Sequence, residues 1–256
     1  MIKYIKNKLF PDEKFVPGPT SDGLQLATKD MYIVEDCIVD MFTQKNVEFD
    51  EACGITWGAA AIFRRCMFDF AGKLVLVGSG DEDKRPLEEN RFVRFEDCWF
   101  RNFGRRGPEI QSGMRVEMEG CFIENWGEPF VWDTRAFGVW VHDGGRLKIK
   151  NSMFVQLDEQ IPFKLWLKDK VGHIGQAIHD HGLKALFQPR TYVNGWRRAC
   201  TVEDDGELMA ENCYKSSRDL VIDNLFGEMS QDEANAKMDW FVGYFTDLRQ
   251  KLSGRK

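Results

Sequence analysis

Two short motifs carry cationic side chains about thirty residues apart, each beside turn residues. The first is Lys73-Leu74-Val75-Leu76-Val77-Gly78-Ser79, in which the lysine begins an apolar run that ends at a Gly-Ser turn. The second is Gly104-Arg105-Arg106-Gly107-Pro108, which follows the apolar segment 98–100. Fixed cations of this kind can bind an anionic ligand. Each could equally be a solvated charge at a strand end or in a turn, so their meaning depends on the elements that position them.

A short signature that recurs along the chain indicates what those elements are. Each copy reads apolar, two polar, small, then apolar. The small positions are Cys37, Cys66, Cys98, Cys121, Ser152 and, in a looser copy, Cys213. They are 29, 32, 23, 31 and 61 residues apart, and the last spacing is about twice the usual one. Short alternating segments separated by turns are typical of strands, and a period of roughly 20 to 30 residues without a helical pattern indicates a solenoid.

The repeat therefore predicts an all-β fold, a short right-handed parallel β-helix with a C-terminal α-helix. The same position in successive coils of such a fold stacks at about 4.8 Å. We expect the cysteines to form an internal ladder that Ser152 continues. Metal or redox chemistry is the alternative for the seven cysteines, but the sequence has no CxxC pair and no zinc spacing, and buried thiols are usually inert.

The chain divides into three parts. Residues 1–20 contain three prolines and are predicted to form an N-terminal arm. Residues 21–223 form the predicted β-helix, with an irregular insertion around 158–200 that holds three of the four histidines. In that insertion His179-Asp180-His181 could bind a metal ion, although an isolated HxH in a polar loop more often has no such role.

Residues 224–256 contain the predicted amphipathic helix. Ser230-Gln231-Asp232-Glu233 is a capping box, which predicts a helix that begins there and ends near Leu252. Apolar residues follow one face, namely Met238, Phe241, Phe245, Leu248 and Leu252. We expect this helix to cover the end of the core or to dock to a partner, and we assign it no catalytic role.

Composition limits the function classes. The net charge of −6 provides no basic field that would attract nucleic acid. No stretch approaches the ~20 apolar residues of a membrane span, and the N-terminus lacks the apolar core of a signal peptide, which predicts a protein made in the cytoplasm. The surplus of aromatic rings, 20 Phe and 8 Trp against 5 Tyr, suggests stacked core layers or platforms for a sugar. Candidate platforms are Trp57, Trp126, Trp132 and Trp140.

The stretch from Ser21 to Gly127 resembles the pectate lyases of the parallel β-helix type. Three landmarks occur in the order of that family. Residues 22–26 with 32–37 are similar to its "DAI…vWIDHC" coil. Residues 73–81 are similar to "KxxLIGSSD", and residues 106–113 are similar to "RxPxxRxG". The two cationic motifs thus occupy the positions of two family motifs.

The resemblance implies that this protein binds an acidic, uronate-containing polysaccharide and cleaves it by β-elimination. In that reaction a base removes the C5 proton while a cation on the sugar carboxylate acidifies it. By the resemblance Arg106 would be the base, and Lys73 would bind the carboxylate and stabilise the developing charge. Arg105 is a second candidate for either role. Two further residues, Gln111 and Trp126, would contact substrate, and Asp22 and Asp50 would bind calcium.

Departures from the family pattern leave a second interpretation open. Gln111 replaces the second arginine of "RxPxxR" and cannot form a charged bidentate fork. Gly54 falls where the family has a calcium carboxylate, and Asp36 replaces a histidine. The alternative is therefore a non-catalytic β-helical component with a structural or adhesive role, for example in a phage virion.

The position of the first landmark suggests a partner. Several coils precede the Asp22-like position in the family, whereas about twenty residues precede it here. A β-helix that begins there exposes unpaired strand edges unless something covers them. We therefore expect another chain, or a second copy, to cap the coil stack. Phage tail proteins have such arrangements and leave the cell by lysis, which is an analogy of fold and context.

Overall fold

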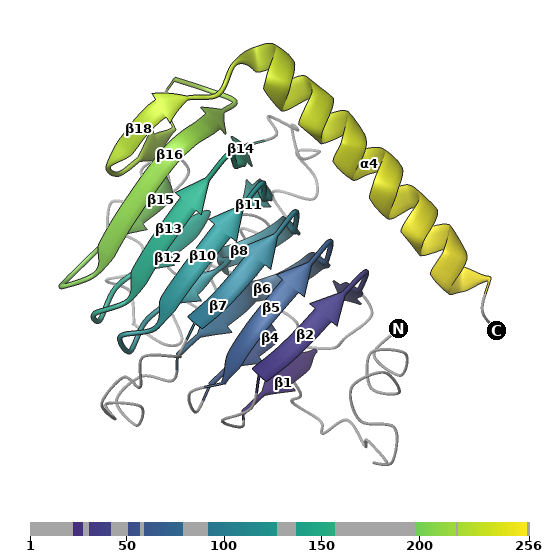
Figure 1. Cartoon of the computed structure of the whole chain (residues 1–256), viewed down its shortest axis with the longest axis horizontal. Helices are drawn as coiled ribbons and strands as arrows, with labels where there is room; N and C mark the ends of the chain where they lie inside the picture. Colours follow the sequence, from purple (N-terminus) through teal and green to yellow (C-terminus); the bar gives the residue numbers. More distant parts are fainter. Residues whose placement is uncertain are drawn as a thin grey trace, which may run out of the picture.

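The computed structural model describes residues 23–27, 31–41, 51–56, 59–78, 92–126, 137–156, 198–218 and 220–254. These residues are mostly β: their 18 strands form one hydrogen-bonded sheet system in which the pairings are parallel. A helix, α4 (Gln231–Ser253), follows the last strand. Figure 1 shows the strands stacked in chain order, with α4 running across the stack. The predicted all-β class with a C-terminal helix is confirmed.

The parallel pairings arrange the strands in three rows. Row 1 contains β2 (Met31–Glu35), β5 (Ala60–Arg64), β7 (Phe92–Glu96), β10 (Arg115–Glu119), β13 (Arg146–Lys150), β16 (Glu207–Lys215) and β18 (Leu225–Glu228). Row 2 contains β3 (Ile38–Asp40), the first part of β6 (Met67–Val77), β8 (Trp99–Arg106), β11 (Phe122–Trp126), β14 (Met153–Val155) and the end of β16. Row 3 contains β1 (Leu24–Leu26), β4 (Glu51–Ile55), the last part of β6, β9 (Glu109–Ile110), β12 (Val139–Val141), β15 (Arg198–Val202) and β17 (Val221–Ile222). The chain passes through rows 3, 1 and 2 in turn, and one such passage is a coil.

Alternating side chains explain why these segments form stacked strands. In β7, Val93 and Phe95 are buried while Arg94 and Glu96 face outward. The next strand of row 1 repeats the pattern, and Phe95 is in register with Met118. In a parallel, in-register stack, residues at the same position of successive strands point to the same face. The inward-facing positions therefore form columns of apolar residues that run through the core.

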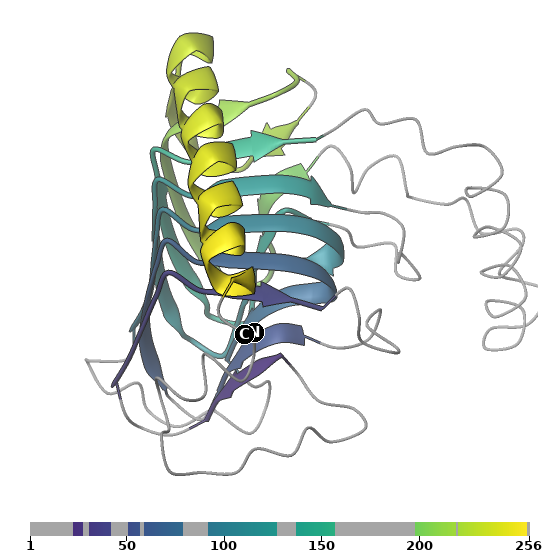
Figure 2. The same cartoon turned by 90° about the vertical axis from the view of Figure 1, so that its right-hand side faces the viewer.

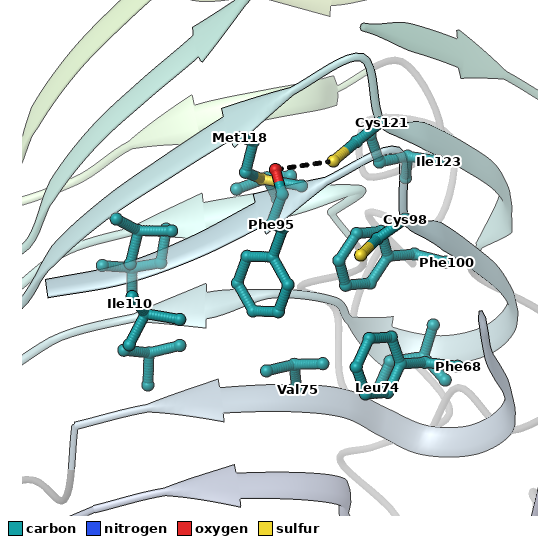
Figure 3. Packing of buried hydrophobic residues seen from close by; sticks show 14 of the residues in the cluster. Phe68, Leu74, Val75, Phe95, Cys98, Phe100, Ile110, Met118, Cys121 and Ile123 are labelled. Carbon is teal, nitrogen blue, oxygen red and sulfur yellow. Dashed lines mark hydrogen bonds between the residues drawn. The ribbon is translucent and has the colours of Figure 1, made fainter. Parts of the chain in front are cut away.

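Aromatic rings fill the middle of the core. The Phe63 and Phe95 rings stack with centroids 5.1 Å apart, and those of Phe68 and Phe100 stack at 5.3 Å. The two columns meet edge to face between Phe95 and Phe100, at 5.3 Å and an interplanar angle of 77° (Figure 3). These are the geometries that aromatic pairs prefer.

The predicted cysteine ladder is confirmed. Cys37, Cys66, Cys98 and Cys121 are all buried. Thiols donate to carbonyl groups of the preceding coil, as Cys121 Sγ does to the Phe95 oxygen at 3.4 Å (Figure 3). Ser152 continues the column, and its Oγ accepts the backbone N–H of Cys121 at 3.0 Å. The residue before the small position adopts the left-handed backbone conformation that makes the turn sharp, as Asp97 does with a φ of 51°.

Burial should make these thiols unreactive. Burial raises the pKa of Cys66, Cys98 and Cys121, and the pKa of Cys213 is raised to about 11. We expect iodoacetamide at neutral pH to leave the folded protein unmodified, because the thiolate is the reactive form. All seven cysteines should be alkylated once the chain is unfolded in urea, as counted by intact mass. Rapid alkylation of any thiol in the folded protein would contradict this.

Helix α4 begins and ends close to the predicted residues. The Ser230 side chain accepts the Glu233 N–H, and the Glu233 carboxylate accepts the Ser230 N–H, which completes the predicted capping box. The helix lies along the side of the coil stack (Figure 2), where its buried face packs on outward residues of row 2, namely Ile38, Met67, Trp99, Phe122 and Met153. The expectation that it covers the end of the core is therefore corrected.

Polar contacts hold α4 to both ends of row 2. Tyr244 Oη donates to Asp36 Oδ1 at 2.6 Å. Arg249 pairs with Asp69 at 2.8 Å and with Asp40 at 3.3 Å. At the other end Tyr214 Oη donates to Gln231 Oε1 at 2.6 Å. The helix therefore spans the described strands of row 2 from β3 to the end of β16.

The predicted arm over 1–20 lies outside the described residues. Of the predicted insertion around 158–200, residues 198–200 belong to β15, and the remainder also lies outside them. Within the ranges given above, no helix combines the length and apolar character needed to cross a membrane.

Candidate functional site

The two cationic motifs meet on neighbouring strands. Lys73 in β6 is the register partner of Arg106 in β8, next to an irregularity that begins after Ala71. Their side chains are 23% and 13% exposed, whereas Leu74 and Val75 beside Lys73 are fully buried. Lys73 and Arg106, the last residue of β8, therefore lie side by side where row 2 passes into row 3, and Lys73 is also in register with Glu51 of row 3.

Both cations are paired with carboxylates of the same face. Lys73 Nζ lies 2.8 Å from Glu51 Oε1, and Glu51 is the register partner of Lys73 in β4. Arg106 Nη1 lies 2.5 Å from Glu109 Oε1. Each positive charge therefore has a negative counterpart within the protein.

Glu109 is the centre of this arrangement. It lies in β9, is 4% exposed, and its Oε1 also lies 3.1 Å from His142 Nε2. Burial raises the pKa of Glu109, but the hydrogen bond from His142 and the charges of Arg106 and Lys73 together outweigh burial and hold this pKa below its ordinary value of 4.5. Glu109 is therefore ionised at neutral pH. Its second oxygen, Oε2, is buried and has no hydrogen-bond partner among the described residues.

Trp140 provides the surface on which the other groups pack. It lies in β12 and is the register partner of Glu109. The His142 ring stacks on it with centroids 3.8 Å apart and planes at 24°, and Arg106 Cζ lies 4.3 Å from its centroid. We call the side chains of Lys73, Arg106, Glu109, Trp140 and His142 the row 3 cluster.

The side chain of Gln111, in the second motif, is hydrogen-bonded to the backbone of the first motif. Its Nε2 donates to the Gly78 carbonyl oxygen at 3.3 Å, so the end of the second motif is bonded to the end of the first. Gly78 has φ +97°, and an added Cβ would lie 2.4 Å from the Gln111 oxygen. A glycine is required there, because only glycine adopts this conformation without strain and leaves room for that carbonyl.

Trp126 lies in the core, in contrast to its predicted role in contacting substrate. It is fully buried, and its ring meets Phe154 edge to face at 6.4 Å. A sugar ring cannot stack on an indole that has no exposed surface. The other candidate platforms, Trp57 and Trp132, lie outside the described residues, and so does the side chain of Arg105, whose backbone is in β8.

The described residues do not fit a calcium carboxylate at Gly54. Gln25 of β1 lies over this glycine, and an added Cβ would be 2.0 Å from Gln25 Oε1. Asp22, Asp50 and the histidines 179 and 181 lie outside the described residues. Across the described ranges, no group of three or more His, Cys, Asp or Glu side chains is placed to hold a metal ion. Calcium binding stays a prediction.

Two residues of the row 3 cluster were missed by sequence reasoning. Glu109 follows Pro108 within the second motif, and His142 comes 33 residues later. That separation is one coil period, which is the signal that could have paired them. Neither residue stands out by its type alone, because single acidic residues and single histidines are common on protein surfaces.

Comparison with known protein families, with curated proteins and with solved structures finds no match to this chain.

Proposed function

We propose that this chain is a short right-handed parallel β-helix of the pectate-lyase type that binds an acidic, uronate-containing polysaccharide at the outer face of row 3 and cleaves it by β-elimination. The observation that carries the proposal is the register pairing of Lys73 with Arg106. The three rows of parallel strands, visited in turn by the chain, support the β-helix.

The chemistry follows from the charges at this face. A uronate carboxylate gains negative charge on its oxygens as the C5 proton leaves, and fixed cations beside it lower the energy of that state. Lys73 has three N–H donors, and the described structure shows Glu51 accepting one of them. Lys73 and Arg106 together would therefore bind the carboxylate and stabilise the charge that develops on it.

A second function, a non-catalytic structural or adhesive component, is favoured by a different observation. Glu51 and Glu109 already balance the charges of Lys73 and Arg106, and Gln111 is bonded to the Gly78 backbone. Such a balanced network also suits a scaffold that holds a glycan without cleaving it. A partner chain that caps the coil stack, and release within a virion, belong with this alternative.

Incubation with polygalacturonate and with other uronate polymers, with and without added calcium, separates the two. We expect unsaturated product, followed by its ultraviolet absorbance, and a loss of about 10²–10³ in kcat for Lys73→Met, the typical cost of removing one charge-stabilising donor. Lys148→Met is the matched control, because Lys148 is exposed on row 1.

Each outcome of this assay decides between the functions. Binding of a polymer without product would favour the structural component. Neither binding nor product with any polymer would exclude both the lyase and the glycan-holding scaffold. Equal loss of activity in the Lys148 control would show that the effect of Lys73→Met is not specific to row 3.

A further inference from the structure

The pair formed by Glu109 and His142 has no role in the function proposed above. Glu109 lies in β9 of row 3, and His142 directly follows β12, the neighbouring strand of that row. The backbone N–H of His142 donates to the Ile110 carbonyl oxygen at 3.0 Å. The strand ladder itself therefore fixes where the imidazole lies relative to the carboxylate.

The protonation of the pair follows from its surroundings. Arg106 Nη1 lies 2.5 Å from Glu109 Oε1, and this ion pair keeps the carboxylate ionised, so Glu109 can only accept hydrogen bonds. His142 Nε2, at 3.1 Å from Glu109 Oε1, must therefore be the donor. A neutral imidazole has one N–H, so the lone pair is on Nδ1. Among the described residues Nδ1 has no hydrogen-bond partner, and the His142 side chain is 12% exposed.

Arg106 is already engaged in a different way. Its Nη1 donates to the Glu109 oxygen that also faces His142, and its guanidinium lies over Trp140. A group that donates to a carboxylate is suited to supply positive charge, whereas proton removal requires an available lone pair. In the row 3 cluster the described group with such a lone pair is the imidazole.

We propose that His142, oriented by Glu109, is the general base that removes the C5 proton; this rests on the function proposed above. Nδ1 bonds to the C5 proton, and the electron pair of the C5–H bond becomes the C4=C5 double bond. The C4–O bond breaks, and the leaving oxygen takes a proton from water. The imidazolium, stabilised by Glu109, then releases its proton to water, so the step balances without an oxidant or reductant.

His142→Gln tests this in the full-length chain with polygalacturonate. Glutamine can keep a donor toward Glu109 but has no basic lone pair. We expect kcat to fall by about 10²–10⁴-fold, the usual contribution of a general base, while binding of the polymer is unchanged. In His142→Ala, added free imidazole should restore part of the activity. The neighbouring Asp143→Asn is the control, because Asp143 is exposed and its φ of 49° suits asparagine.

The outcomes separate this inference from the proposed function. A wild-type protein that forms product, with His142→Gln equally active, would overturn the role of His142 and leave the lyase in place. A wild-type protein that forms no product from any polymer would overturn both. Loss of activity together with loss of the folded circular dichroism spectrum, or no imidazole rescue in His142→Ala, would assign His142 a packing role and also overturn the proposal.

Discussion

Replacing Phe95 with alanine is expected to lower the free energy of unfolding by about 3–5 kcal/mol, the range for a buried Phe→Ala change. Phe95 is fully buried in row 1 and contacts three other rings, by stacking on Phe63 and edge to face with Phe68 and Phe100. Removing it leaves a cavity at the meeting point of both aromatic columns. The strands on either side are held in register by their backbones and cannot collapse into the space.

Phe226→Ala is the matched control. Phe226 lies in β18 and is 79% exposed, so the same chemical change there should alter the free energy of unfolding by less than about 0.5 kcal/mol. Urea unfolding of both variants, followed by circular dichroism, measures the difference. Equal losses of unfolding free energy from the two substitutions would show that the aromatic columns do not stabilise the core.

Replacing Glu109 with alanine is expected to cost about 3–5 kcal/mol of unfolding free energy, the typical cost of breaking a buried ion pair by removing one partner. The change leaves Arg106 mostly buried without its carboxylate, and His142 Nε2 without its acceptor. Glu117→Ala is the control, because Glu117 pairs with Arg94 while 47% exposed, and such pairs contribute about 0–1 kcal/mol. Similar losses from both variants would contradict the buried pair.

The contribution of Glu109 should also depend on pH in one direction. Because the folded pKa is below the ordinary value of 4.5, its stabilisation is present above about pH 4.5 and is lost as the pH falls through the folded pKa. Glu109→Gln cannot ionise. The difference in unfolding free energy between wild type and Glu109→Gln should therefore shrink below pH 4.5, and a difference that grows there would contradict the ionised carboxylate.

The repeat was sufficient to predict which residues share a column. A solenoid repeat transfers register from one coil to the next, so Cys66, Cys98 and Cys121 could be aligned from the signature that recurs around them. The two cationic motifs, about thirty residues apart, are likewise one coil period apart, and Lys73 is in register with Arg106. A local sequence motif was equally informative at Ser230, where the capping box predicted the start of α4.

The place of α4 was missed, although its signal is in the sequence. Two consecutive apolar residues follow each small position from Cys37 to Ser152, as in Trp99-Phe100 and Phe122-Ile123. In a strand, neighbouring side chains point to opposite faces, so both faces of row 2 are apolar and the outer face must be covered.

Trp126 was placed wrongly for a related reason: aromatic content alone does not distinguish a ring that points into the core from one that is exposed to a sugar. Glu109 and His142 could be paired only by applying the coil period to single polar residues.

Helix α4 and row 2 have nearly the same repeat length. A helix rises about 5.4 Å per turn and paired strands lie about 4.8 Å apart. Between Arg249, which reaches β3, and Gln231, which meets β16, α4 makes about five turns, while row 2 takes about five steps through β6, β8, β11 and β14. One turn therefore accompanies each coil. A duplicated coil would leave an outward apolar residue uncovered, and a deleted coil would leave one turn of helix overhanging. The length of the helix thus matches the number of described row 2 strands that it covers, so an evolutionary change in that number requires a matching change in α4.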